Sequence, residues 1–217
     1  MPQIASLKSP AHSPAHTVVV LDFETSGLSP NQGDRAIEIG AVLIENGVIT
    51  KRFSQLMNPG FRISSFIEDY TGINNQMLKD APPCKEVMQS FAEFMGCHHL
   101  VAHNAAFDRR FLEAEFAHFG HEYSGQFSCS LLVARRLYQG AANHQLGTLV
   151  KYKGLPNDGT FHRALADAQM TAHLWLSMLD ELKIEYGIEN PPFSLMQRIA
   201  TKNKTEVGRF LRQYARG

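Results

Sequence analysis

The chain has 217 residues, 44% of them hydrophobic, and a formal net charge of zero at pH 7. This length suits one domain of ordinary size with a sizeable core, and the apolar content is normal for a soluble globular protein. No stretch approaches the roughly 20 apolar residues that span a bilayer, so no membrane-spanning helix is expected. Because the chain is not strongly basic, we expect no long electrostatic footprint on nucleic acid.

The N-terminal segment and the cysteines give two further expectations. Residues 1–16 are rich in Ser, Pro, Ala and His and lack an apolar segment, so they predict a disordered lead-in rather than a secretory signal. The three cysteines are odd in number and form no Cys-x-x-Cys pair. They favour a reducing, cytoplasmic compartment and argue against a cysteine-based zinc site.

Three strands are expected in the first part of the chain. Residues 17–24 form an apolar, β-branched run, and residues 36–45 and 48–57 have two further strand patterns. Asn46-Gly47 between the last two is a strong hairpin signal. The three strands are therefore predicted to be antiparallel.

Helices dominate the rest of the chain and alternate with short strands. Asn104 is expected to be the N-cap of one of these helices. Strands first and helices interleaved later indicate a mixed sheet with helices on its faces. The expected helices cover residues 82–95, 104–119, 145–152, 162 or 163 to 186, and 193–214; a strand covers 100–102, a strand and then a helix cover 127–138, and residues 58–80 are irregular with short helical pieces.

The C-terminal segment carries an excess of positive charge. Between residues 191 and 217 there is one acidic residue, Glu206, and there are six basic ones, a net charge of +5. This pattern fits either a solvated helix face or a contact for nucleic acid or an acidic partner. The basic residues are Arg198, Lys202, Lys204, Arg209, Arg212 and Arg216.

Two acidic residues, Asp22 and Glu24, stand at the end of the first apolar run. Side chains alternate across a strand, so both carboxylates point to one face, roughly 6–7 Å apart along the backbone. There they repel each other and lose hydration. The fold therefore needs a bound metal, an Arg or Lys partner, or a shared proton at this position.

Three more polar residues stand at notable positions. Asp108 lies in the first turn of an expected helix, where the helix dipole alone would favour a carboxylate. Asp167 interrupts an apolar flank of the long helix and needs a partner, unless it lies at an exposed edge or pairs with Arg163. His162 precedes Asp167 by five residues and has the pKa range of a general base at neutral pH.

Together these residues make up three motifs. The chain resembles the DnaQ-like 3′–5′ exonucleases of the DEDDh subgroup, in which four acidic residues and a histidine form the active site. The likeness extends over roughly residues 17–185 and is closest to the proofreading (epsilon) subunits of bacterial DNA polymerase III and their free-standing relatives. A family loop that often reads His-Gly-Ile has Thr71 in its first place here, so no role for a histidine carries over. The motifs are Asp22-Phe23-Glu24-Thr25-Ser26-Gly27-Leu28, His103-Asn104-Ala105-Ala106-Phe107-Asp108 and His162-Arg163-Ala164-Leu165-Ala166-Asp167-Ala168.

The resemblance implies an α/β, ribonuclease H-like fold, with a mixed sheet that is antiparallel over its first three strands and then parallel, flanked by helices. It places an exonuclease domain over residues 17–187, between the lead-in over 1–16 and the basic helical extension over 188–217 that composition and charge predict. It also implies two Mg²⁺ or Mn²⁺ ions, which oxygen ligands suit better than zinc.

By the same resemblance, each of the five motif residues receives a role. Asp22 would bridge the two ions, and Glu24 and Asp167 would complete the site of the ion that binds the nucleophilic water. Asp108 would support the second ion, and His162 would take the proton from the water.

Contacts to the 3′-terminal nucleotide follow from the resemblance as well. Phe66 is expected to offer a stacking surface, although core packing is an alternative for Phe66 and Phe107. The expected substrate contacts are Phe23, Thr25, Leu28, Phe66, Asn104, Phe107 and His162.

The sequence thus predicts a metal-dependent 3′–5′ exonuclease that acts on single-stranded DNA ends and releases nucleoside 5′-monophosphates. One alternative is an RNA-trimming enzyme of the ribonuclease T or oligoribonuclease kind. Another is a polymerase-associated proofreading subunit, and a third is an inactive nucleic-acid-binding module. A polymerase, or a second copy of the chain, would be contacted through the C-terminal extension, and no membrane contact is expected.

Overall fold

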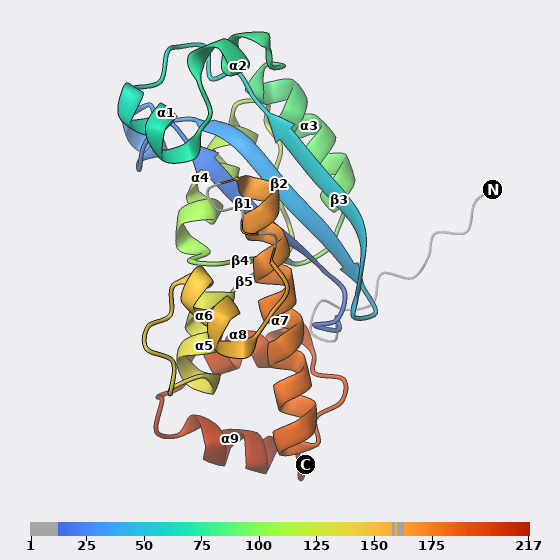
Figure 1. The fold of residues 1–217 in the computed structure, drawn as a ribbon. Helices are drawn as coiled ribbons and strands as arrows, with labels where there is room; N and C mark the ends of the chain where they lie inside the picture. The colour runs from blue at the N-terminus through green and yellow to red at the C-terminus, as the bar shows by residue number, and fades with distance from the viewer. Residues whose placement is uncertain (1–12, 158, 160–162) are drawn as a thin grey trace, which may run out of the picture.

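A five-stranded mixed sheet forms the centre of the molecule, in the computed structural model that describes residues 13–157, 159 and 163–217 (Figure 1). Its strand order is β3-β2-β1-β4-β5. The pairs β1–β2 and β2–β3 are antiparallel, whereas β4 is parallel to β1 and β5 is parallel to β4. The predicted mixed sheet is confirmed. The strands are β1 (Val18–Thr25), β2 (Ala36–Glu45), β3 (Val48–Leu56), β4 (Leu100–Ala102) and β5 (Phe127–Cys129).

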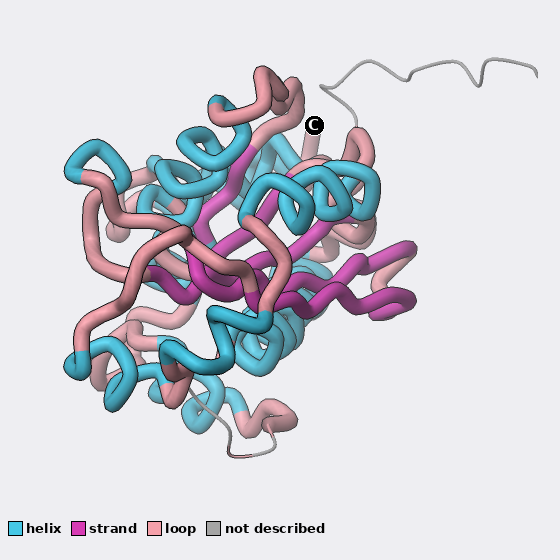
Figure 2. Tube along the Cα trace, turned by 90° about the horizontal axis from the view of Figure 1, so that it is seen from above, coloured by secondary structure: helices cyan, strands magenta, loops and turns pink. Residues whose placement is uncertain are grey.

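Helices cover both faces of this sheet, and Figure 2 shows the strands in the middle with helices on either side. Alternate residues of β1 point to the two faces. Val18 and Val20 pack in a cluster with Trp175 of α7, whereas Val19 and Leu21 pack in a second cluster with α3 and α4. The helices are α1 (Ser65–Thr71), α2 (Asn75–Asp80), α3 (Cys84–Met95), α4 (Ala106–Ala117), α5 (Ser130–Leu137), α6 (Leu146–Lys153), α7 (Ala164–Tyr186), α8 (Phe193–Thr201) and α9 (Val207–Tyr214), with a short 3-10 helix, η2 (Pro30–Gln32).

The hairpin between β2 and β3 forms at the predicted position. Asn46 and Gly47 have φ angles of 52° and 83°. Positive φ at both central residues is typical of the two-residue turns that best match the twist of a β-hairpin. Most side chains of β3 are exposed, as suits an edge strand.

Two helix predictions are wrong in part. Asn104 is not the N-cap of α4, because the helix begins at Ala106 with Ala105 as its N-cap. Asn104 instead takes a left-handed conformation with a φ of 72°, which asparagine tolerates better than most residues, and its carbonyl accepts a hydrogen bond from the Phe107 amide.

The single helix expected over residues 193–214 is two helices, α8 and α9. Lys202 is extended, with a ψ of 153°. The Asn203 side chain then accepts hydrogen bonds from the amide and the hydroxyl of Thr205. Such local side-chain bonds compete with helical ones.

Both ends of the described chain pack on the α7 face of the sheet. The Ala15 carbonyl accepts a hydrogen bond from Trp175 Nε1 at 2.9 Å, and the Ala15 amide donates one to the Pro191 carbonyl. Phe193 of α8 and Leu211 of α9 are fully buried in the cluster that contains Trp175. Residues 1–12 of the expected lead-in lie outside the described residues. Residues 13–16 are not disordered as predicted, because Pro14 bridges Pro192 and Ala15 is fully buried. The boundary expected at residue 187 stays a prediction. None of the helices in the described part of the chain has the length and apolar content needed to cross a bilayer.

Candidate active site

The end of β1 and the first turn of α7 bring three carboxylates together. Asp22 and Glu24 point to the α7 side of the sheet, in line with Val18 and Val20. One ligand atom from each of Asp22, Glu24 and Asp167 lies within 4.8 Å of the others. Asp22 and Asp167 remain partly accessible, so the cluster is open to a ligand.

Asp108 joins this cluster from α4. Its side chain is only 2% exposed, and Oδ1 accepts a hydrogen bond of 3.2 Å from the amide of Phe23. Phe23 lies between the two acids of β1, so this bond holds Asp108 against the same short stretch of strand. All four acids expected from the sequence therefore meet at one end of the sheet.

The ionised forms of Asp22, Glu24 and Asp108 are disfavoured. Burial, followed by the carboxylates of Asp108, Asp167 and Glu24, raises the pKa of Asp22 well above its usual range. Burial, followed by the charge of Asp167, raises the pKa of Glu24 to about 8. Burial also raises the pKa of Asp108 to about 7, although the Phe23 amide acts in the opposite direction. A positive ligand would relieve this repulsion.

The donor set fits a hard divalent cation. Three carboxylates offer only oxygen atoms, the ligands that Mg²⁺ and Mn²⁺ prefer, whereas structural zinc sites mostly use cysteine and histidine. The cluster can therefore hold the divalent metal that the likeness to DEDDh exonucleases implies.

A cleft of about 740 Å³ opens beside the acids and is lined by residues of α1, the end of β1 and the start of α4. Leu28 and Phe66 are 77% and 72% exposed, so core packing is the wrong explanation for Phe66. Phe107 both lines the cleft and packs on Phe111, at 5.0 Å between ring centroids. The expected substrate contacts among the described residues all line it: Phe23, Thr25, Leu28, Phe66, Asn104 and Phe107.

His162 lies outside the described residues, and its role stays a prediction. Arg163, which the sequence allowed as a partner of Asp167, donates hydrogen bonds to Glu38 of β2.

Three residues around the site received no role from the sequence. Glu38 is 2% exposed beneath Arg163, and the signal for it is a carboxylate within the apolar run of β2. The Tyr70 ring stacks on Phe66 at 6.1 Å, and its place four residues later on one helix face could have predicted this. His103 donates from Nε2 to the His144 carbonyl, and burial lowers its pKa to about 4, so it is a neutral structural residue.

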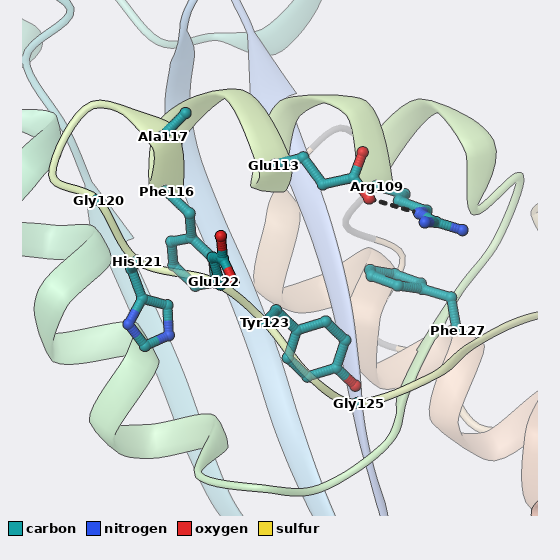
Figure 3. Close-up of a pocket in the computed structure, with 10 residues that line it drawn as sticks. All are labelled: Arg109, Glu113, Phe116, Ala117, Gly120, His121, Glu122, Tyr123, Gly125 and Phe127. Atoms are coloured by element: carbon teal, nitrogen blue, oxygen red, sulfur yellow. Dashed lines mark hydrogen bonds and ion pairs between the residues drawn. The ribbon is translucent and has the colours of Figure 1, made fainter.

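A second hollow, of about 480 Å³, lies between α4 and the loop that follows it (Figure 3). An ion pair between Arg109 and Glu113 lies at its edge, and the Tyr123 hydroxyl donates to the His98 carbonyl. This second hollow shares no lining residue with the cleft beside the acids. The chemistry expected from the sequence therefore belongs to the first cleft.

Comparison with known proteins supports the family resemblance noted in the sequence. A family model described as "Exonuclease" matches residues 19–175. The chain is 35% identical to DNA polymerase III subunit epsilon of Aquifex aeolicus over 173 residues, which are 79% of this chain and 85% of that protein.

Two larger proteins match over a small part of their own length. Identity is 42% to the PolC-type DNA polymerase III of Caldanaerobacter subterraneus subsp. tengcongensis, over 79% of this chain and 12% of the polymerase. Identity is 37% to the 3′–5′ exonuclease DinG of Bacillus subtilis, over 76% of this chain and 18% of DinG.

Solved structures give the same picture. Exonuclease X in complex with a 5′-overhanging duplex superposes with a TM-score of 0.66 and 28% identity, over 84% of this chain and 99% of that one. The nuclease domain of 3′hExo, a DEDDh family member, superposes with a TM-score of 0.67 over 81% of this chain and 95% of that domain. Its identity is 19%, so this second likeness shows the fold alone.

Proposed function

Because the chain belongs to the exonuclease family and carries a 3′–5′ exonuclease domain, we propose that it removes nucleotides from the 3′ ends of single-stranded DNA. The products would be nucleoside 5′-monophosphates. The observation that carries this proposal is the meeting of Asp22, Glu24 and Asp167 within 4.8 Å, with Asp108 fixed beside them by the Phe23 amide.

The four acids would hold two Mg²⁺ or Mn²⁺ ions. Asp22 would be shared between the ions, Glu24 and Asp167 would complete one site, and Asp108 would support the other. Ions bound there would stabilise negative charge on the scissile phosphate and make a bound water more acidic. Since the carboxylates are reluctant to ionise without a cation, ion binding would be coupled to proton release.

The remaining chemistry would come from protein side chains. His162 stands directly before the residue that caps α7, and it would accept the proton of the attacking water. Leu28 and Phe66 are exposed on the cleft, where they would contact the last bases without regard to sequence. Phe23, Thr25, Asn104 and Phe107 also line the cleft and would orient the 3′ end.

Association with a polymerase is a second part of the proposal. It is favoured by similarity over 85% of the length of a polymerase III epsilon subunit. The basic surface of α8 and α9 would be the contact, with a second copy of the chain as the other candidate partner. A pull-down with the replicative polymerase, compared with sizing of the protein alone, separates these partners.

One set of assays tests the activity. The purified chain is incubated with 5′-labelled single-stranded DNA, duplex DNA or single-stranded RNA, in Mg²⁺, Mn²⁺ or chelator, with Asp22→Ala as the blank. The proposal expects a ladder from the 3′ end on single-stranded DNA, with metal only. A ladder on RNA alone would instead identify an RNA-trimming enzyme, because the enzyme would then require the 2′-hydroxyl.

A further inference from the structure

Strand β2 meets the first turn of α7 directly behind the two acids of β1. In the β1–β2 ladder, Gly40 pairs with Asp22 and Glu38 pairs with Glu24. Directly opposed residues of an antiparallel pair project to the same face. Gly40 and Glu38 therefore lie on the α7 side of the sheet, next to the acids.

Gly40 lets the backbone of α7 rest on the backbone of β2. A Cβ atom at position 40 would lie 2.0 Å from the Leu165 amide nitrogen and 2.1 Å from the Ala164 carbonyl carbon. No side chain fits there unless the first turn of α7 moves away. The height of this turn above the acids is therefore set by the lack of a side chain at Gly40.

The Glu38 carboxylate accepts hydrogen bonds from the same turn. Its Oε1 accepts a hydrogen bond of 2.8 Å from Arg163 Nη2, and Arg163 Nε donates a second bond at 3.2 Å. Its Oε2 accepts a bond of 3.0 Å from the Ala164 amide. Arg163 is the N-cap residue of α7, yet its own side chain makes no capping bond. Glu38 thus supplies this cap from the neighbouring strand.

The hydrogen bonds to Glu38 lie one helical turn before Asp167. The Asp167 amide donates to the Arg163 carbonyl at 3.1 Å. A displacement of Arg163 would therefore also move Asp167, which completes the acidic cluster. The Arg163 guanidinium also balances the charge of Glu38, a buried carboxylate beside Glu24.

We propose that Glu38, Arg163 and Gly40 are positioning residues for the candidate active site, because together they seat the first turn of α7 so that Asp167 meets Asp22 and Glu24. This inference rests on the proposed function, because it assumes that the acids bind a metal ion. A role in stability alone would predict loss of thermal stability without loss of metal affinity.

The test measures Mn²⁺ affinity by calorimetry, below the melting temperature of each variant, and the cleavage of a short single-stranded oligonucleotide. Arg163→Gln removes the charge of a side chain that is 43% exposed, and Gly40→Ala displaces the first turn of α7. Both should weaken Mn²⁺ binding by about 10- to 100-fold, as loss of groups that orient metal ligands does, and kcat should fall while KM changes little. Arg163→Lys, which keeps the charge, should recover part of the affinity.

Leu211→Ala is the matched control, because Leu211 is fully buried in α9, away from the cleft. It should lower the melting temperature and leave Mn²⁺ affinity unchanged. The inference fails if Arg163→Gln and Gly40→Ala bind Mn²⁺ as the wild type does. A wild-type protein that binds no Mn²⁺ and cuts no oligonucleotide would instead overturn the proposed function, so the two failures are distinguishable.

Discussion

Replacing Glu24 by glutamine removes one charge from the acidic cluster and keeps the shape of the side chain. Glu24 is 9% exposed, and its pKa is raised from 4.5 to about 8 by burial and by the neighbouring carboxylates. The unfolded chain releases this proton near pH 4.5, whereas the folded chain keeps it to about pH 8. Between these values the folded state binds more protons, so the free energy of unfolding falls as the pH rises.

The size of the effect follows from the pKa difference. One pKa unit corresponds to about 1.4 kcal/mol, so ionisation of Glu24 should destabilise the metal-free protein by about 4 kcal/mol at pH 8 and by less than about 1 kcal/mol at pH 5. For a chain of this size, 1 kcal/mol changes Tm by about 2–4 °C. Glu24→Gln should therefore raise Tm by about 10 °C at pH 8 and change it little at pH 5.

Differential scanning fluorimetry in chelator at both pH values provides the assay. Mn²⁺ should then raise the Tm of the wild type at pH 8, because it binds the folded state, and should raise that of Glu24→Gln less. Glu113→Gln, which removes a carboxylate with 56% exposure on α4, is the control for loss of a solvated charge. Equal effects of Glu24→Gln on Tm at pH 5 and pH 8 would mean that Glu24 does not keep its proton in the folded protein.

Three further predictions concern the active site and the core. Asp22→Ala should abolish nucleotide release and weaken Mn²⁺ binding, whereas His162→Ala should lower kcat by about 10²–10⁴-fold with Mn²⁺ affinity intact; turnover near the wild-type value in His162→Ala would remove the general-base role. Phe66→Ala should raise KM for single-stranded DNA by about 5- to 150-fold, the equivalent of 1–3 kcal/mol of base stacking, and an unchanged KM would show that no base stacks there. Phe193→Ala should lower the free energy of unfolding, measured in urea, by about 3–5 kcal/mol, because Phe193 is fully buried in α8. Phe61→Ala, at 46% exposure, should lower it much less. Equal losses would mean that α8 is not part of the core.

Local patterns in the sequence predict the first strands and the shared face of Asp22 and Glu24 well, whereas the meeting of these acids with Asp108 and Asp167 is expected only from the resemblance to the family. The bounds of β2 follow from a mainly apolar run that ends at the Asn46-Gly47 turn. The shared face of Asp22 and Glu24 follows from strand alternation alone. Both features depend on residues that are close in the chain, so one sequence is sufficient.

Features that depend on distant residues were not predictable in this way. Glu38 and Arg163 are 125 residues apart, and nothing local links them before the strand register is known. Asn104 has the composition of an N-cap, yet it adopts a left-handed φ of 72° one residue before the actual cap. The break between α8 and α9 contains neither proline nor glycine and depends on a side-chain turn at Asn203.

The acids of β1, α4 and α7 are proposed to form one cation site. A crystal grown with Mn²⁺ and measured at the manganese absorption edge tests it most directly. We expect anomalous density for two ions, one in contact with Asp22, Glu24 and Asp167 and the other between Asp22 and Asp108. Density elsewhere on the molecule, with none beside these four carboxylates, would contradict the claim.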